Sequence, residues 1–186
     1  MRTLFAHIGV SLDGFISDGA GQPVLPVEEE FQHYIDELLS SIDGMVLGRK
    51  AFESLGAYWP SAGDEVSPIQ ARYMHELPKY VLSTSAGFAG KWHNSQPLGE
   101  DPISGLQSLK AEDGRPVAVF AGAAAVTSVL SFGLLDELRL IVHPSLVGAE
   151  TRLFYATYPQ TDLHLNDVRQ FPSGTVLLSY SVVGSR

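Results

Sequence analysis

The stretch "VLGRKAFESLG" (residues 46–56) decides how the chain is interpreted. It begins as an apolar strand, passes through Gly48 and opens a helix at Arg49 and Lys50. Cations are unfavourable at a helix N-terminus by about 0.3–1 kcal/mol, because the helix dipole is positive there. The free backbone N–H groups of the same turn bind anions well, and Gly48 lets a ligand approach them. The pattern therefore indicates a phosphate site, with a solvated pair of side chains at a helix start as the structural alternative.

The composition limits what else the chain could bind. Its 186 residues are 45% hydrophobic, which is enough for one domain over residues 1–186 with a full core. The net charge of −9 argues against nucleic acid and membrane partners, since both attract positive surfaces. The absence of cysteine excludes disulfides and cysteine-ligated metal and fits a cytoplasmic protein. No apolar run approaches the roughly 20 residues of a membrane span, and the N-terminus does not fit a signal peptide.

Predicted strands and helices alternate along the chain. Strands are expected at 3–10, 44–48, 79–84, 116–121 and 136–144, and helices at 28–42, 49–55, 102–112 and 123–133. This alternation predicts an α/β fold with a mixed, mostly parallel sheet and helices on both faces. Segments 162–171 and 174–183 flank "PSG", which predicts an antiparallel C-terminal hairpin at one edge. The proline-containing segments 57–78 and 85–101 are expected to be loop-rich.

Small or polar residues follow three of these strands, where open α/β sheets bind their ligands. Gly122, Ala123 and Ala124 come after strand 116–121 and would let a ligand lie against the backbone of a helix start. Ser83 and Thr84 end strand 79–84, and their hydroxyls could bind phosphate or cap a turn. With Arg49 and Lys50, these ends predict a ligand with several phosphates, such as a dinucleotide. Neither the G-x-G-x-x-G nor the Walker A fingerprint is present.

Two carboxylates are candidates for proton transfer. Asp13, in "SLDGF", lies just beyond the first strand, where a turn aspartate before glycine is the structural alternative. Glu28 opens a helix, where the dipole stabilises acidic side chains. His7 and His143 lie in strands, and the six histidines show no metal-ligand spacing, so no metal site is expected. No serine lies in a G-x-S-x-G context, which leaves hydrolase chemistry unsupported.

Several motifs together resemble a known superfamily. "LGRKAFESLG" resembles the G-R-x-T-x-E-S segment of dihydrofolate reductases, and "KYVLSTSAG" resembles their second cofactor strand. Residues 119–154 resemble the C-terminal half of the wider family, which includes the riboflavin-biosynthesis reductase domain of bifunctional deaminase-reductases. "SLDGFI" is the characteristic opening of that family. With "AYWP" and "LPKYVLS", the similarity is closest to its stand-alone bacterial proteins.

The resemblance implies a three-layer αβα dihydrofolate reductase-like fold, NADPH as hydride donor and a homodimer. Its implied substrate is pterin- or ribosylaminopyrimidine-like, as for 5-amino-6-(5-phosphoribosylamino)uracil reductase. Arg49 and Lys50 would meet the cofactor phosphates, and Ser83 and Thr84 the adenosine 2′-phosphate. The implied cofactor residues also include Gly122, Ala123 and Ala124 at the pyrophosphate and Ile16 at the nicotinamide, with residues 17–26 as a flap. A carboxyl that orients the ring supports protonation of its nitrogen, and we rank Asp13 above Glu28 for this role.

Three alternatives stay open at this point. Ala51, Ala121 and Ala124 stand where relatives often have residues that contact phosphate, so NADH is not excluded as the cofactor. A true dihydrofolate reductase is the second enzymatic reading. A nucleotide-binding module without catalytic activity is the hypothesis from a different functional class, and the three alanines support it. For the dimer, the apolar strands "LRLIVHP" and "VLLSYSVV" are expected to pack on the partner.

Overall fold

The computed structural model describes residues 1–17, 28–62, 67–83, 91–120, 122–148, 151–154 and 160–185. The strands within this part are β1 (Leu4–Ser11), β2 (Gly44–Gly48), β3 (Lys79–Leu82), β4 (Ser95–Pro97), β5 (Val117–Val119), β6 (Glu137–His143), β7 (Thr161–Gln170) and β8 (Val176–Ser185). The helices are α1 (Glu29–Ser41), α2 (Arg49–Tyr58), α3 (Pro68–Glu76), α4 (Pro102–Ala111) and α5 (Ala123–Ser131), with a 3₁₀ helix, η1 (Trp59–Ser61).

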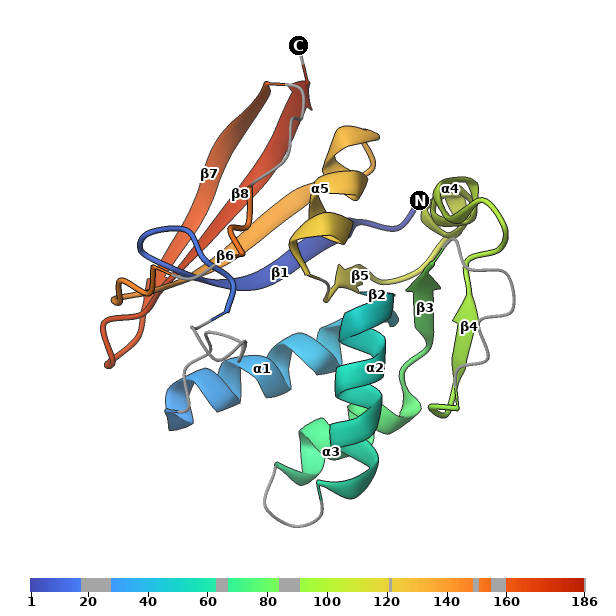
Figure 1. The fold of residues 1–186 in the computed structure, drawn as a ribbon, viewed down its shortest axis with the longest axis horizontal. Coiled ribbons are helices and arrows are strands. Elements are labelled where there is room, and N and C mark those ends of the chain that lie inside the picture. Colours follow the sequence, from blue (N-terminus) through green and yellow to red (C-terminus); the bar gives the residue numbers. More distant parts are fainter. Residues whose placement is uncertain are drawn as a thin grey trace.

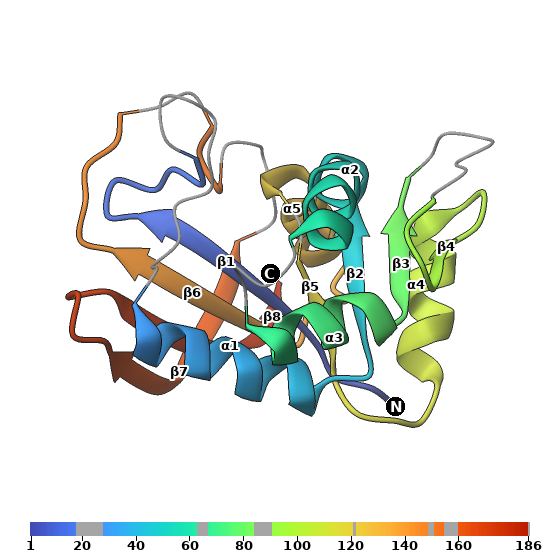
Figure 2. The same cartoon turned by 90° about the horizontal axis from the view of Figure 1, so that it is seen from below.

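These elements form three layers around one sheet (Figure 1). In the described residues the sheet has eight strands in the order β4-β3-β2-β5-β1-β6-β8-β7. Helices α1, α2 and α3 lie on one face and α4 and α5 on the other (Figure 2). Strands β1 to β6 run parallel, and β8 pairs antiparallel with both β6 and β7. The predicted αβα fold with an antiparallel C-terminal hairpin is confirmed.

Segments 57–78 and 85–101, expected to be loop-rich, contain three elements that were not predicted from the sequence. Helix α3 lies in the first segment, where the Ser67 hydroxyl accepts a hydrogen bond from the Gln70 N–H and Pro68 occupies the first turn. Proline is well tolerated there, because its missing N–H would have no helical partner. The 3₁₀ helix η1 lies in the same segment, and β4 lies in the second. Strand β4 has only three residues and is mostly exposed at the sheet edge, so it carries no apolar pattern.

Strand β1 is buried along its whole length, because helices cover both of its faces. Its side chains alternate between the two layers. Leu4 and Ile8 pack with the core under α4 and α5, whereas Phe5 packs with the core under α1, α2 and α3. Strands β2 and β5 are likewise buried except at the end of β2. The central strands therefore form a rigid base for the residues that follow their carboxyl ends.

The exposed apolar edge of the sheet is β7. The strands that were expected to meet a partner, β6 and β8, are both interior, because β8 lies between β6 and β7. The dimer itself stays a prediction. On β7, in contrast, Leu163, Leu165 and Val168 are 42%, 46% and 52% exposed. A long strand with apolar side chains at a sheet edge favours pairing with another chain.

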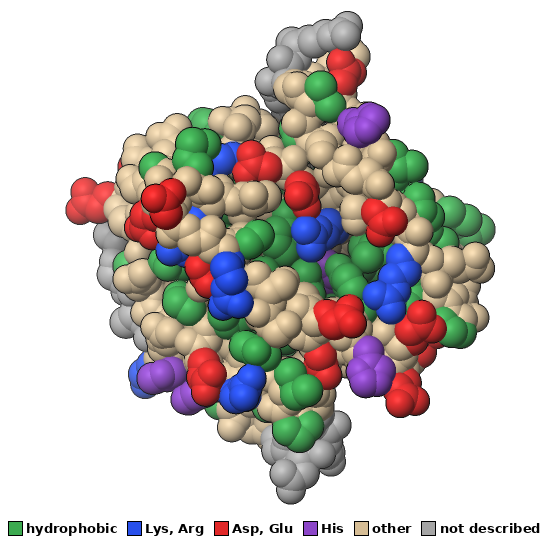
Figure 3. Space-filling view, turned by 180° about the vertical axis from the view of Figure 1, so that it is seen from behind, with side chains coloured by type: hydrophobic (Ala, Val, Ile, Leu, Met, Phe, Trp, Pro, Cys, Tyr) green, Lys and Arg blue, Asp and Glu red, His purple; other side chains and the backbone are tan. Residues whose placement is uncertain are grey.

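Charges of both signs are spread over the surface. On the face shown in Figure 3, acidic and basic side chains are interspersed around exposed hydrophobic ones. In the part of the chain that the structure describes, no helix combines the length and the apolar character of a membrane span. The same residues contain no group of three or more histidines and carboxylates that could hold a metal ion.

Candidate cofactor and substrate site

The N-termini of α2 and α5 meet at one edge of the sheet. Strands β2 and β5 are parallel neighbours, with Met45 opposite Ala118 and Val46 opposite Val119. Helix α2 begins directly after β2, and α5 begins shortly after β5, and the two helices cover opposite faces (Figure 2). Both first turns therefore present backbone N–H groups and the positive end of a helix dipole at the same edge. This is the point at which open α/β sheets bind phosphate-bearing ligands.

The two cations predicted from the sequence lie at this edge. Arg49 is the first residue of α2, and its side chain is 57% exposed. Its Nε donates to Glu53 Oε1 at 2.9 Å, so the guanidinium is held along the helix surface. Lys50 is exposed and pairs with no other residue that the structure describes. Gly48 is the N-cap of α2 and provides no side-chain cap, which leaves the first N–H groups of the helix open to a ligand.

The start of α5 is shaped by Gly122 and two alanines. Gly122 is exposed, has ordinary dihedral angles (φ −70°, ψ 171°) and accepts hydrogen bonds from the N–H groups of Ala125 and Val126. A Cβ added to it would meet no atom within 4 Å. Packing within the described chain therefore does not require glycine here, and the space beside the backbone is open to a ligand. Ala123 is buried against the core, whereas Ala124 is exposed.

The remaining predicted cofactor residues are only partly described. Ser83 is half-buried and ends a described segment at the carboxyl end of β3, whereas Thr84 and Ala121 lie outside the described residues. The predicted flap over 17–26 lies outside them as well, apart from Ser17. Ile16 is partly buried against the core under α4 and α5, and its N–H donates to the Thr151 carbonyl at 3.1 Å.

The Asp13 carboxylate is held in a network of hydrogen bonds. It accepts from Ser11 Oγ at 2.6 Å, from the Val147 N–H at 3.1 Å and from the Gly148 N–H at 3.0 Å. The Ser11 hydroxyl, and then these backbone N–H groups, hold the pKa of Asp13 below its usual value. Asp13 therefore stays ionised and fastens the turn after β1 to the segment after β6. This geometry is better suited to positioning the turn than to delivering a proton.

The Glu28 carboxylate is also engaged by the fold. It accepts hydrogen bonds from the Ser173 N–H at 2.8 Å and from Ser173 Oγ at 2.6 Å. Glu28 thus connects the N-terminus of α1 to the turn between β7 and β8. His143, at the end of β6, has a buried Nε2 without a hydrogen-bond partner among the described residues. Burial lowers the pKa of His143, and the charge of Glu28 opposes this shift.

A buried polar pair under α1 was not singled out from the sequence. His7 is 6% exposed and stacks on Tyr34, with ring centroids 5.6 Å apart, and the ring of Phe120 contacts it edge-on at 5.4 Å. Phe120 directly precedes the connection to α5. His7 Nε2 and Tyr34 Oη have no hydrogen-bond partner of good geometry in the described residues, although Arg139 lies near both side chains.

The protonation states of this pair follow from burial. Burial, with a smaller contribution from the charge of Arg139, lowers the pKa of His7 to about 3. Burial raises the pKa of Tyr34 to about 12, although Arg139 and Arg169 act in the opposite direction. Both groups are therefore neutral near pH 7. Leaving a buried polar atom unpaired costs about 1–3 kcal/mol, so these two atoms are an unfavourable feature of the core unless a partner satisfies them. The only signal in the sequence was a histidine within an apolar strand, "LFAHIGV".

Comparison with known proteins identifies the family. The profile of the RibD C-terminal domain matches residues 2–177. The chain belongs to the RibD C-terminal domain family. Among RibD-like relatives, the uncharacterized Bacillus subtilis protein YyaP is 27% identical over 180 residues, which cover 96% of this chain and 94% of YyaP.

Solved structures share the fold of this RibD-type domain. A Shewanella protein named for riboflavin biosynthesis has a TM-score of 0.76 at 18% identity, over 98% of this chain and 100% of the other. The Thermotoga maritima deaminase/5-amino-6-(5-phosphoribosylamino)uracil reductase has a TM-score of 0.70 at 14% identity, over 97% of this chain and 56% of the other. Enterococcus faecalis dihydrofolate reductase, solved with NADP(H), has a TM-score of 0.65 at 12% identity, over 98% and 97% of the two chains. The dihydrofolate reductase-like fold expected from the sequence is confirmed.

Proposed function

We propose that this RibD-type domain is an NADPH-dependent reductase that acts on a pterin- or ribosylaminopyrimidine-like ring. The observation that carries the proposal is the meeting of the α2 and α5 N-termini at one sheet edge, with Arg49, Lys50 and the open backbone at Gly122. The net charge of the chain is −9, so such a local concentration of donors and cations supports an anionic ligand at this edge. Family membership supports a reductase, since the RibD C-terminal domain is the reductase part of the deaminase-reductases.

The residues at this edge fit a dinucleotide. Arg49 and Lys50 would pair with its phosphates, and the N–H groups of Ala123 and Ala124 would donate to the pyrophosphate beside Gly122. NADPH, when bound, would supply the hydride. Ser83 lies at the strand end where a 2′-phosphate would be recognised, and NADH remains an alternative cofactor because Ala124 offers no charge. Comparing the affinities of NADPH and NADH tests this preference.

The buried polar pair would bind the substrate ring. His7 is neutral, and its Nε2 and Tyr34 Oη, both buried and without a hydrogen-bond partner of good geometry among the described residues, would pair with polar atoms of a heterocycle on binding. Asp13 would hold the turn after β1 in place and orient the side chains around the ring, rather than give up a proton itself. Glu28 lies near His143 and remains the second carboxylate candidate. Reduction of a C=N bond requires a proton for the nitrogen, which Glu28 or a bound water would deliver.

One observation favours a second candidate function, nucleotide binding without catalysis. Both candidate carboxylates, Asp13 and Glu28, already accept hydrogen bonds from the fold. A protein of this kind would bind NADPH and leave every ring substrate unchanged. The substrate also separates the two enzymatic readings, because turnover of dihydrofolate would indicate a dihydrofolate reductase.

The test combines binding and turnover. Calorimetric titration with NADPH measures affinity, and the loss of NADPH absorbance measures reduction of dihydrofolate and of a ribosylaminopyrimidine. The proposal expects binding and turnover of at least one ring. Binding without turnover of either ring would favour the non-catalytic function, and the absence of binding at millimolar NADPH would contradict both.

A further inference from the structure

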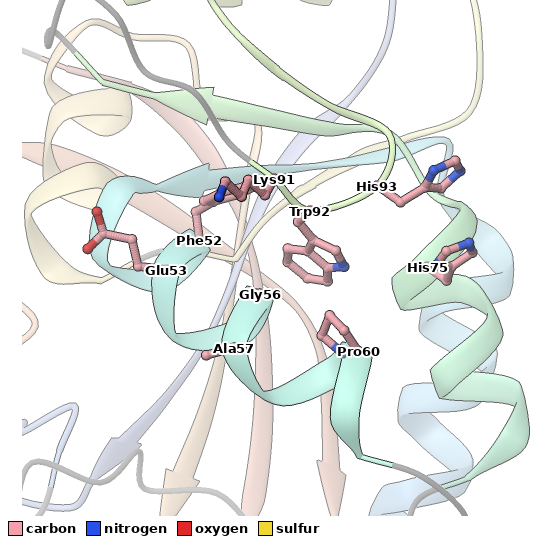
Figure 4. A pocket seen from close by; sticks show the side chains of 9 residues that line it. All are labelled: Phe52, Glu53, Gly56, Ala57, Pro60, His75, Lys91, Trp92 and His93. Atoms are coloured by element: carbon pink, nitrogen blue, oxygen red, sulfur yellow. The ribbon is translucent and has the colours of Figure 1, made fainter.

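A cavity lies beside α2, on the side away from α5. Its volume is about 460 Å³. We call it the Trp92 pocket, after a lining that includes Phe52, Gly56 and Ala57 of α2, His75 of α3, and Trp92 and His93 before β4 (Figure 4). His75 and His93 lie near the amino end of β3, whereas the cofactor residues lie at the carboxyl ends of the strands. No residue assigned above to cofactor or substrate lines this pocket.

The floor of the Trp92 pocket is aromatic and fixed. Trp92 and Phe52 are 7% and 5% exposed, and their ring centroids are 5.8 Å apart. The fully buried Lys79 ammonium lies 4.7 Å from the centroid of the Trp92 ring. It donates hydrogen bonds to the carbonyl oxygens of His75 at 2.7 Å and His93 at 3.1 Å. The indole and the two histidine backbones are therefore held in place before any ligand arrives, which lowers the entropic penalty of binding.

Gly56 borders the aromatic floor of the pocket. It lies inside α2, where glycine is less favourable than alanine because it loses more backbone entropy on folding. A Cβ at this position would contact the Trp92 ring at 3.5 Å, which is an ordinary van der Waals distance. Packing therefore does not require glycine here. Figure 4 shows Gly56 next to the indole, so a larger side chain at this position would cover the accessible part of the ring.

The polar residues of the pocket favour a negative ligand. His75 and His93 are exposed and stack with their ring centroids 4.3 Å apart, so their imidazoles lie together at one end (Figure 4). Lys91 and Glu53 lie at the other end, and Glu53 already pairs with Arg49 at 2.9 Å. The pocket thus has three basic side chains, Lys91 and the two histidines. Its single carboxylate, Glu53, is already paired with Arg49. A flat ring would contact the aromatic floor while its anionic group binds at this basic rim.

We propose that the Trp92 pocket is a second ligand site, separate from the cofactor site, that takes a planar aromatic anion. Anilinonaphthalene sulfonate is a suitable probe, and phenylnaphthylamine is its uncharged analogue. Trp59 and Trp92 are the two tryptophans of the chain, so Trp59→Phe leaves Trp92 as the single fluorescent reporter. The probe should quench Trp92 fluorescence saturably, and saturating NADPH should not change its affinity.

Two sets of variants test the location and the charge preference. Gly56→Leu fills the pocket and should weaken binding of the probe by about tenfold or more. The control variant Ser54→Leu, at an exposed position of the same helix outside the lining, should bind the probe like the parent. Thermal unfolding of both variants checks that they are folded. The double variant His75→Ala/His93→Ala should lower the preference for the sulfonate over phenylnaphthylamine, because it removes two of the three basic side chains of the rim. The aromatic floor should be unchanged, because the backbone carbonyls that hold Lys79 are retained.

Three results would overturn the proposal. Equal affinity of the probe for the parent and for folded Gly56→Leu would place the probe elsewhere. Competition between the probe and NADPH would make the pocket part of the cofactor site. An unchanged sulfonate preference in the double histidine variant would remove the anion from the proposal. A failure of NADPH to bind would contradict the proposed function and leave these results on the pocket unaffected.

Discussion

Burial of His7 should make the protein sensitive to mild acid. The pKa of His7 is lowered from 6.5 to about 3, mainly because the imidazole is removed from water. Below pH 6.5 the unfolded chain gains a proton on this side chain that the folded chain does not. The free energy of unfolding should therefore fall by about 1.4 kcal/mol per pH unit below 6.5, up to about 5 kcal/mol near pH 3.

His7→Phe isolates this contribution. Phenylalanine keeps a ring against Tyr34 and Phe120 and cannot titrate. Urea unfolding of parent and variant between about pH 7 and pH 5 should show a difference in the free energy of unfolding that shifts by about 2 kcal/mol over this range. Asp13 and Asp43 do not interfere, because their lowered pKa values start from 3.8 and their stabilisation is lost only at lower pH. His143 acts in the same direction as His7 but is present in both proteins.

Parallel pH curves for the parent and His7→Phe would refute this reasoning. They would mean that His7 titrates in the folded protein as it does in the unfolded chain, so water reaches it. Nuclear magnetic resonance of the His7 imidazole gives an independent check, because its shifts should not change between about pH 7 and pH 5.

Four further predictions concern the proposed site and the dimer. Arg49→Ala should weaken NADPH binding by about 1–3 kcal/mol in calorimetry, whereas Arg72→Ala, which removes the same i,i+4 type of ion pair from α3, should not. Gly122→Val should abolish NADPH binding and change the free energy of unfolding by no more than about 1 kcal/mol. A larger decrease in the free energy of unfolding would mean that the fold itself requires the glycine. Asp13→Asn should lower the free energy of unfolding along with turnover, and a loss of turnover at unchanged stability would instead make Asp13 a catalytic residue. We also propose a homodimer that forms through β7. Light scattering should show twice the 20.1 kDa chain mass for the parent and the monomer mass for Leu165→Lys, and a monomeric parent would contradict the proposal.

The elements with a strong apolar pattern could be predicted from the sequence. Strand β2 and helix α2 follow from "VLGRKAFESLG", and α1 follows from apolar residues spaced by threes and fours. Helix α3 was missed because Pro68 suggests a break in the chain, although at a helix start it is compatible with the helix. Strand β4 was missed because three mostly exposed residues at an edge carry no pattern, and its pairing with β3 depends on the rest of the sheet.

The candidate site was predictable where it depends on chain order and not where it depends on packing. Arg49 and Gly122 directly follow strands, so the rule that ligands bind at carboxyl strand ends was enough to find them. The hydrogen bonds of Asp13 join residues 134 and 135 positions apart, which no local pattern reveals. His7 and Tyr34 meet only when α1 packs on the sheet, so their unpaired polar atoms are a property of the folded chain.

The central claim is that NADPH binds between the N-termini of α2 and α5. Amide chemical shifts recorded by nuclear magnetic resonance during an NADPH titration test it most directly, because they report the location of the ligand together with its affinity. We expect the largest changes at the N–H groups of Arg49, Lys50, Ala123 and Ala124, with little change at His75 and His93. No change at millimolar NADPH, or changes confined to the Trp92 pocket, would contradict the claim.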